Sequence, residues 1–255
     1  MSNQSPAYQA LCSDFYDLDK PFPTVEELSF YLKLAKEASG SILEPMCGTG
    51  RFLIPLLEQG YSVTGFDSSA EMLHRCHQKC LEKHFTSNLH QADFATFLPS
   101  EIYQLIFIPS GSFGHLISPK AIDQALTFLA TYLKSGGKFV VEIETPRAVR
   151  HPQNVWRGRW VTKPDGSKIV LSVLSEYNSI SKVETGLFRY ELWTKNTMTH
   201  CEVEEYQVKY YEPKEIELLF KQHDFKVAAK WDTRSFVKLE NVDESSAIIY
   251  ECVKE

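Results

Sequence analysis

Three acidic residues stand where strand-like apolar runs of this sequence end. Glu44 closes the first run, Asp67 follows the second, and Asp93 comes shortly after the third. Because parallel strands present their carboxyl ends at one edge of a sheet, we expect the three carboxylates along one rim. Carboxylates attract cations and repel phosphates. The chemistry predicted at this rim is therefore the binding of a positively charged ligand.

The first acid leads into a glycine turn, Gly48-Thr49-Gly50, which opens a predicted helix. Glycine lets the backbone pass close to a ligand, since a β-carbon would collide with it. The helix start adds unpaired amides and a positive dipole end. A dinucleotide-binding turn has a third glycine three residues further on, which is absent here, and Glu44 would repel a pyrophosphate. An NAD(P)-dependent oxidoreductase is therefore the disfavoured alternative.

The positions of the other two acids point to a nucleoside. A carboxylate that ends strand two, here Asp67, can accept both hydroxyls of a ribose. Asp93, after strand three, can accept an exocyclic amine. S-adenosylmethionine combines a ribose, an adenine amine, an ammonium and a sulfonium, and we expect it as the cofactor.

Strands and helices alternate around these residues. Thr24 and Glu27 form a capping box that starts a helix. Alternation at this pitch predicts an α/β fold, a doubly wound, seven-stranded, mostly parallel Rossmann-like sheet with helices on both faces. The expected strands are 41–44, 61–66, 88–91, 103–109, 138–143, 225–231 and 247–253, and the expected helices are 24–38, 51–59, 69–83, 119–133 and 213–223.

The pattern changes after strand five. Ile169, Leu171 and Val173 alternate with polar residues, and Pro164-Asp165-Gly166 is typical of a hairpin turn. We predict an antiparallel β insertion over residues 151–210 that forms part of the substrate site.

The rest of the chain divides into two parts. The methyl-donor-binding α/β core is expected to comprise residues 24–150 and 211–255. The first 23 residues are aromatic and show no regular pattern. We expect them to be an irregular lid that excludes water from the cofactor, with Tyr16 among the cofactor-binding residues.

Two stretches of the sequence resemble the class I S-adenosylmethionine-dependent methyltransferases. They are the run Ile42–Met72 and the segment Leu89–Phe94. The run Ser110–Leu116 is similar to the segment after strand four in the branch that methylates small molecules, including amino-sugar N-methyltransferases. The resemblance implies transfer of a methyl group to a nitrogen or oxygen of a small molecule. A non-catalytic protein that binds S-adenosylmethionine on the same fold is the alternative.

The resemblance also implies roles for individual residues. Glu44 lies near the methionine ammonium, and Asp67 holds the ribose hydroxyls. The other implied cofactor-binding residues are Gly48 and Gly50 for close passage, Ser68, Met72, Asp93 and Phe94 around the adenine, and Pro109 and Ser110 beside the methionine part. Met46 belongs to the same set, but the family usually has glycine there, which predicts a shifted loop or an altered affinity.

Two residues are candidates for the general base. His115 comes just after strand four, on the substrate side, and its ordinary pKa suits proton transfer near neutral pH. Glu144, at the end of strand five, is the second candidate, and it could instead bind a cationic substrate.

Composition excludes several other classes. The 255 residues carry a net charge of −6, which disfavours nucleic acid as a partner. Apolar runs are too short for a membrane span, Met1–Gln9 lacks a secretory signal, and six scattered cysteines suit reduced thiols, so a cytoplasmic protein is expected. His77, Cys80 and His84 share a helix face, but no matching ligand pair follows and no metal is expected. A homodimer is compatible with the sequence.

Overall fold

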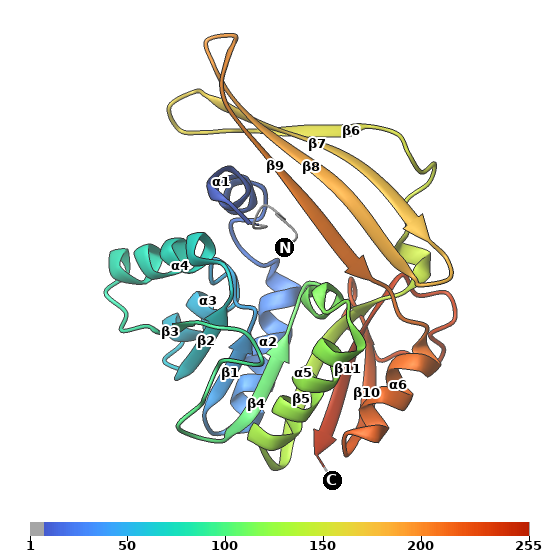
Figure 1. The fold of residues 1–255 in the computed structure, drawn as a ribbon. Coiled ribbons are helices and arrows are strands. Elements are labelled where there is room, and N and C mark those ends of the chain that lie inside the picture. The colour runs from blue at the N-terminus through green and yellow to red at the C-terminus, as the bar shows by residue number, and fades with distance from the viewer. Residues whose placement is uncertain (1–7, 255) are drawn as a thin grey trace.

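The computed structural model describes residues 8–254 of the chain. These residues form a central sheet covered by helices and a second sheet that projects from one end of it (Figure 1). None of the helices in this range is long and apolar enough to cross a membrane.

The central sheet has seven strands, and β11, the last strand in the sequence, is the one that runs antiparallel to the others. β1, β2, β3, β4 and β5 pair in parallel, whereas β11 pairs antiparallel with both β5 and β10. The predicted doubly wound, mostly parallel sheet is therefore confirmed. The strand order is β10 (Phe225–Asp232), β11 (Ala247–Lys254), β5 (Leu133–Glu144), β4 (Tyr103–Ile108), β1 (Ile42–Pro45), β2 (Val63–Asp67) and β3 (Asn88–Gln91).

Helices cover both faces of this sheet. One apolar core lies under α2 (Val25–Ala38), α3 (Leu53–Glu58) and α4 (Ala70–Glu82). A second core lies under α5 (Pro119–Tyr132) and α6 (Pro213–Gln222). The capping box predicted for α2 is present, because Thr24 Oγ1 accepts from the Glu27 amide at 3.2 Å and Glu27 Oε2 accepts from the Thr24 amide at 2.7 Å.

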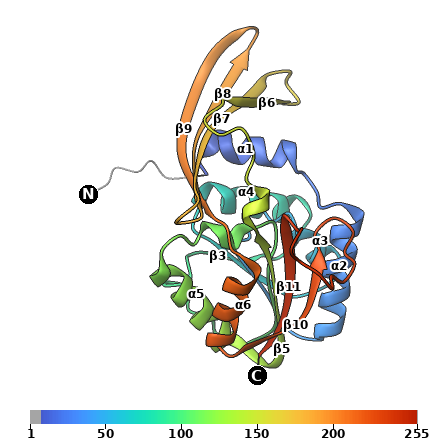
Figure 2. The same ribbon diagram turned by 90° about the vertical axis from the view of Figure 1, so that its right-hand side faces the viewer.

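The second sheet is antiparallel and lies between β5 and α6 in the chain, where an antiparallel insertion was predicted. Its order is β6 (Arg157–Thr162), β7 (Lys168–Asn178), β8 (Val183–Thr194) and β9 (Thr197–Lys209). The sheet stands over the carboxyl edge of the parallel strands (Figures 1 and 2), and β9 contacts residues 112–115, which follow β4.

The segment before α2 differs from the prediction. Residues 10–19 form a helix, α1 (Ala10–Asp19), so the expectation of an irregular segment is wrong there, while residues 1–7 lie outside the described part. Leu11 and Phe15 pack against Ile169, Leu171 and Tyr190 of the second sheet. Short helices gain most of their stability from such tertiary contacts, which the local sequence does not reveal. α1 thus lies between the projecting sheet and α4 (Figure 1).

Candidate functional site

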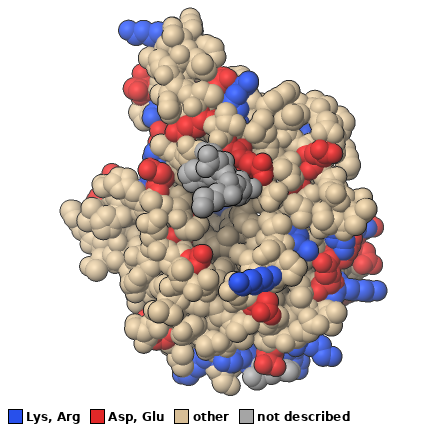
Figure 3. Space-filling model, viewed as in Figure 1, with Lys and Arg blue, Asp and Glu red and all other residues tan. Residues whose placement is uncertain are grey.

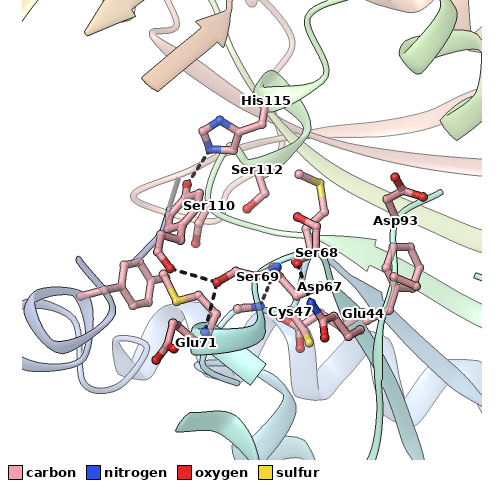
Figure 4. Close-up of a pocket in the computed structure, with 18 of the residues that line it drawn as sticks. Glu44, Cys47, Asp67, Ser68, Ser69, Glu71, Asp93, Ser110, Ser112 and His115 are labelled. Carbon is pink, nitrogen blue, oxygen red and sulfur yellow. Dashed lines mark hydrogen bonds between the residues drawn. The ribbon is translucent and has the colours of Figure 1, made fainter. Parts of the chain in front are cut away.

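A cavity of about 830 Å³ lies at the carboxyl edge of the parallel strands, and Figure 4 shows part of its lining. Its wall combines the loops after β1, β2, β3 and β4 with residues 205–207 of β9. Predicted site residues in the wall are Tyr16, Glu44, Met46, Gly48, Asp67, Ser68, Met72, Asp93, Phe94, Pro109, Ser110 and His115. Gly50 and Glu144 are the two predicted residues that the wall does not include.

Asp67 is fixed between the glycine turn and α4. Its Oδ2 accepts from the Gly48 amide at 2.9 Å, and its Oδ1 accepts from the Ser69 amide at 2.9 Å. Burial raises the pKa of this carboxyl, and the two amides oppose the rise by stabilising the ionised form. The carboxylate therefore has one orientation at the end of β2.

Glu44 is the most deeply buried acid of the wall, with 2% of its surface exposed. Burial raises its pKa well above the ordinary value, and the Leu53 amide only partly opposes this. Its Oε2 has no hydrogen-bond partner among the residues that the structure describes. A buried acceptor without a partner is costly, so this site suits a ligand that brings a donor or a positive charge.

The two glycines of the turn have different surroundings. A β-carbon on Gly48 would meet nothing within 4 Å, so this residue leaves open space at the cavity. A β-carbon on Gly50 would lie 2.5 Å from Cys76 Sγ of α4. Gly50 therefore allows the turn to pack on α4, and Gly48 allows close approach of a ligand.

Met46 takes the backbone conformation that glycine favours. Its φ is +57°, in the left-handed region, and its side chain packs against the core. The loop thus keeps a glycine-like backbone with a methionine at this position.

Asp93 and Phe94 form a less enclosed part of the wall. Asp93 is exposed, and its Oδ1 accepts from the amides of Ala95 and Thr96 and from the Thr96 hydroxyl at 2.7–3.0 Å. Phe94 packs edge-on against Phe66. One oxygen of Asp93 thus shapes its own turn, which leaves the other for a ligand.

Arg51 is a wall residue that the sequence did not single out. Its guanidinium donates to Ser110 Oγ at 3.2 Å, to the Phe22 carbonyl at 3.4 Å and to Glu27 Oε2 at 2.5 Å. The signal for it was its position directly after the glycine turn, at a helix start. Among the described wall residues it is the one Lys or Arg, against the acids Glu44, Asp67, Glu71, Asp93 and Glu205. Several acidic side chains, with Lys and Arg among them, also lie along the projecting sheet on the face seen in Figure 3.

His115 ends the short helix η1 (Ser112–His115), across the cavity from Glu44 and Asp67 (Figure 4). Its Nδ1 lies 3.1 Å from the Gln207 carbonyl, and this carbonyl can only accept, so Nδ1 carries the proton. Nε2 then presents a lone pair to the hydroxyls of Tyr8 at 3.0 Å and Tyr206 at 2.9 Å. Burial lowers the pKa of His115, which keeps the ring neutral.

Tyr8 and Tyr206 were not predicted as site residues. They lie far from His115 in the sequence, on the segment before α1 and on β9, and no local pattern links them. One lone pair on Nε2 faces two hydroxyls, and the two hydroxyls also hydrogen-bond to each other, so one can donate to Nε2 while the other donates to its neighbour.

Glu144 lies behind the turn after β4. Its carboxyl group is 3.3 Å from where a β-carbon on Gly111 would be, and burial raises its pKa. Its neighbour on the same strand face, Glu142, accepts from the Ser110 amide at 3.1 Å, and burial raises the pKa of Glu142 to about 7. Both carboxyls contact the turn from outside the cavity wall.

The cysteines and histidines of α4 do not gather into a metal site in the described part of the chain. Cys76 and Cys80 are fully buried in the core behind the glycine turn.

Comparison with known proteins identifies the central part of the core. Residues 42–137 match the model of a family described as "Methyltransferase domain". This range includes the glycine turn, Asp67, Asp93 and His115. The predicted resemblance to class I methyltransferases is confirmed.

Individual relatives agree with this match. A glycine/sarcosine N-methyltransferase of Parasynechococcus marenigrum (strain WH8102) is 30% identical over 145 residues, which cover 52% of this chain and 51% of that protein. The chain thus matches about half the length of this curated relative.

Solved structures share the whole fold. An S-adenosylmethionine-dependent methyltransferase from Clostridium acetobutylicum ATCC 824 superposes with a TM-score of 0.78 and 17% identity, over 95% of this chain and 97% of that one. The sugar N-methyltransferase KedS8 from Streptoalloteichus sp ATCC 53650 gives a TM-score of 0.76 and 15% identity, over 100% and 97%. At these identities the likeness concerns the fold, including the projecting sheet.

Proposed function

We propose that this chain, whose residues 42–137 form a methyltransferase domain, uses S-adenosylmethionine to methylate a nitrogen atom of a small polar molecule. The observation that carries this proposal is Glu44, a buried carboxyl with an unpartnered oxygen in the wall of a cavity rich in acids. The ammonium of a cationic nucleoside can donate to this oxygen, whereas a pyrophosphate brings acceptors and no donor.

The residues present fit the parts of this cofactor. Glu44 would receive the ammonium, and Arg51 is the cation of the described wall that would pair with the carboxylate. Asp67 would accept the ribose hydroxyls, while Asp93 and Phe94 would receive the adenine. The open space at Gly48 leaves room for the chain between the ribose and the amino acid.

When bound, S-adenosylmethionine supplies a methyl group on a cationic sulfur, which keeps the electrons of the broken carbon–sulfur bond when a nitrogen lone pair takes the methyl. The protein aligns that nitrogen and excludes water, which is most of the catalysis such a displacement needs. His115 is neutral, so its Nε2 can receive the proton that the amine loses, directly or through the Tyr8 or Tyr206 hydroxyl.

Nitrogen is favoured over oxygen as the acceptor by the strength of this base. An alcohol holds its proton far more tightly than an ammonium, and a neutral imidazole suits the weaker task. The substrate end of the wall offers mainly uncharged hydrogen-bonding groups, including Ser112 and Gln207, together with the carboxylate of Glu205. The names of the relatives, a sugar N-methyltransferase and a glycine/sarcosine N-methyltransferase, support a small polar amine.

The same proposal gives roles to the flanking segments. The insertion, residues 151–210, would contribute the substrate side of the cavity through β9. The N-terminal segment, 1–23, would close over the cofactor, and the part of it that is described already contributes Tyr8 and Tyr16 to the wall.

Two measurements test this function. Mass spectrometry of nucleosides released from the purified protein, followed by calorimetric titration with S-adenosylhomocysteine, tests the cofactor. A labelled-methyl screen of amino sugars, glycine and sarcosine, each paired with its hydroxyl analogue, tests the acceptor. We expect transfer to an amine and none to its hydroxyl partner. Tight nucleoside binding without transfer to any acceptor would favour the non-catalytic alternative. Glu44→Gln is the control, and we expect it to bind S-adenosylhomocysteine more weakly than the unmodified protein.

A further inference from the structure

A second buried carboxylate lies beside the cavity, outside the residues assigned so far. Glu204 belongs to β9 and is 3% exposed. Its Oε2 accepts from the Tyr8 amide at 2.9 Å, and its Oε1 accepts from the Gln9 amide at 2.7 Å. On the same strand face, Glu202 Oε2 accepts from the Leu11 amide at 2.7 Å.

These bonds supply what α1 lacks by itself. The first amides of a helix have no partner within the helix, and the N-cap residue Gln9 makes no capping bond with its side chain. The two carboxylates of β9 take the place of a local cap, at the end of the helix where negative charge is stabilising.

Tyr8 connects Glu204 to both halves of the cavity. Its hydroxyl lies 3.0 Å from His115 Nε2, and its carbonyl accepts from Ser69 Oγ at 3.0 Å. Ser69 is the N-cap of α4, and its amide donates to Asp67. The backbone of one residue is thus held by Glu204, while its side chain reaches the histidine and its carbonyl reaches the loop that holds Asp67.

We propose that Glu204 is a positioning residue for methyl transfer, which acts through Tyr8 by fixing its hydroxyl at His115. This inference rests on the proposed function. Glu204 uses both oxygens on two successive amides, so the pair of bonds sets the direction in which the Tyr8 side chain leaves the backbone. Glu202 accepts from the Leu11 amide, further along α1, so it holds the helix without a hydrogen bond to the Tyr8 amide.

A double-mutant cycle separates positioning from simple support of the helix. The variants are Glu204→Gln, Tyr8→Phe and their combination, with Glu202→Gln alone and with Tyr8→Phe as the matched control. Glutamine has the shape of glutamate but turns an NH2 group toward one amide, so one of the two bonds is lost. Tyr8→Phe removes the hydroxyl and keeps both backbone contacts.

We expect Glu204→Gln to lower kcat by about tenfold with a smaller change in the acceptor KM, because small displacements of a reacting group cost up to about a hundredfold. In the Tyr8→Phe background the same change should have almost no effect on kcat. Glu202→Gln should change kcat by the same factor in both backgrounds. If the effects of Glu204→Gln and Tyr8→Phe simply multiply, Glu204 does not act through Tyr8 and the proposal is overturned.

Hydrogen exchange gives a readout that needs no turnover. In Glu204→Gln the amides of Tyr8 and Gln9 should exchange at least tenfold faster, with α4 amides unchanged, and unchanged exchange at Tyr8 would overturn the positioning role. Glu204→Asp, which keeps the charge but shortens the reach, provides a second variant if Glu204→Gln folds poorly, and it should show the same coupling to Tyr8→Phe. Absence of transfer by the unmodified protein would count against the proposed function alone, because the exchange experiment still tests Glu204.

Discussion

The two halves of the cavity are built in opposite ways. The half in which we propose that the cofactor binds, the cofactor half, is charged, and its residues come from the ends of successive strands, as Glu44 and Asp67 show. The half in which we propose that the acceptor binds, the substrate half, consists mainly of uncharged groups. Its central contacts join His115 to Tyr8 and Tyr206, which are 107 and 91 positions away in the sequence. The proposed site for a charged nucleoside is thus built from short sequence motifs at strand ends. The proposed acceptor site depends on how the insertion and an N-terminal helix pack together.

The largest effect that this comparison predicts is at Asp67. Replacement by alanine removes the carboxylate that we propose accepts the ribose hydroxyls, and it leaves the Gly48 and Ser69 amides without their partner. Hydrogen bonds to a charged group are each worth about 1.5–3 kcal/mol, so we expect S-adenosylhomocysteine binding to weaken by ~100-fold in calorimetric titrations.

Asp93→Ala is the matched control for that experiment. Asp93 is exposed and commits one oxygen to its own turn, so we expect it to weaken binding by less than ~10-fold, as for other exposed polar contacts. If both variants lose the same factor in affinity for S-adenosylhomocysteine, the acids contribute only through their shared negative charge. The difference in burial between Asp67 and Asp93 would then not affect binding.

Within the glycine turn the same half offers a prediction on stability. Gly50→Ala adds a β-carbon 2.5 Å from Cys76 Sγ at a residue with a φ of +81°, so overpacking and backbone strain should together cost about 2 kcal/mol of unfolding free energy. Gly48→Ala meets open space at a φ of +54° and should cost only about 1 kcal/mol, from strain alone. Urea denaturation of both variants measures this, and a larger loss for Gly48→Ala would contradict the assigned packing.

The contrast between the halves also explains what the sequence could predict. The strands, the capping box at Thr24 and the cofactor half follow from short-range patterns, because hydrophobic periodicity and strand-end acids lie within a few residues of each other. α1 was missed because its apolar face gains a partner only when the insertion folds over it. Tyr206 and Glu204 were missed for the same reason, since nothing within β9 indicates which distant segment each one contacts.

The neutral state of His115 predicts a pH effect in the substrate half. Burial lowers its pKa below the ordinary 6.5, so the unfolded chain takes up this proton first as the pH falls. This contribution to stability is complete above pH 6.5 and is lost as the pH falls toward the folded-state pKa, with a slope of at most about 1.4 kcal/mol per pH unit.

Comparing the unmodified protein with His115→Gln isolates this contribution from that of the buried carboxyls. Between pH 7.5 and pH 5.5, the unfolding free energy of the unmodified protein should fall more than that of His115→Gln. A difference that stays constant over this range would mean that the ring is not held neutral.

The smallest predicted effect concerns α1, which contacts both halves. On the side of the projecting sheet, Leu11 and Phe15 make buried apolar contacts, and Glu202 and Arg159 of that sheet add polar contacts to α1. On the side of α4, the side-chain contacts include partly exposed ion pairs such as Asp17–Lys79 at 2.9 Å. Partly exposed ion pairs contribute about 0.2–1 kcal/mol and are weakened by salt. α1 should therefore separate from α4 and stay with the projecting sheet when the cavity opens.

Lys79→Ala should then raise the dissociation rate of S-adenosylhomocysteine by about twofold, the equivalent of roughly 0.4 kcal/mol, in stopped-flow displacement. Arg159→Ala removes a comparable pair, Asp19–Arg159 at 2.9 Å, on the side of the projecting sheet. Because Leu11 and Phe15 keep their apolar contacts with the projecting sheet, Arg159→Ala should release S-adenosylhomocysteine at the rate of the unmodified protein. If the dissociation rate rises by the same factor in both variants, the contacts of α1 with α4 and those with the projecting sheet both break when the ligand leaves. α1 then moves independently of the projecting sheet.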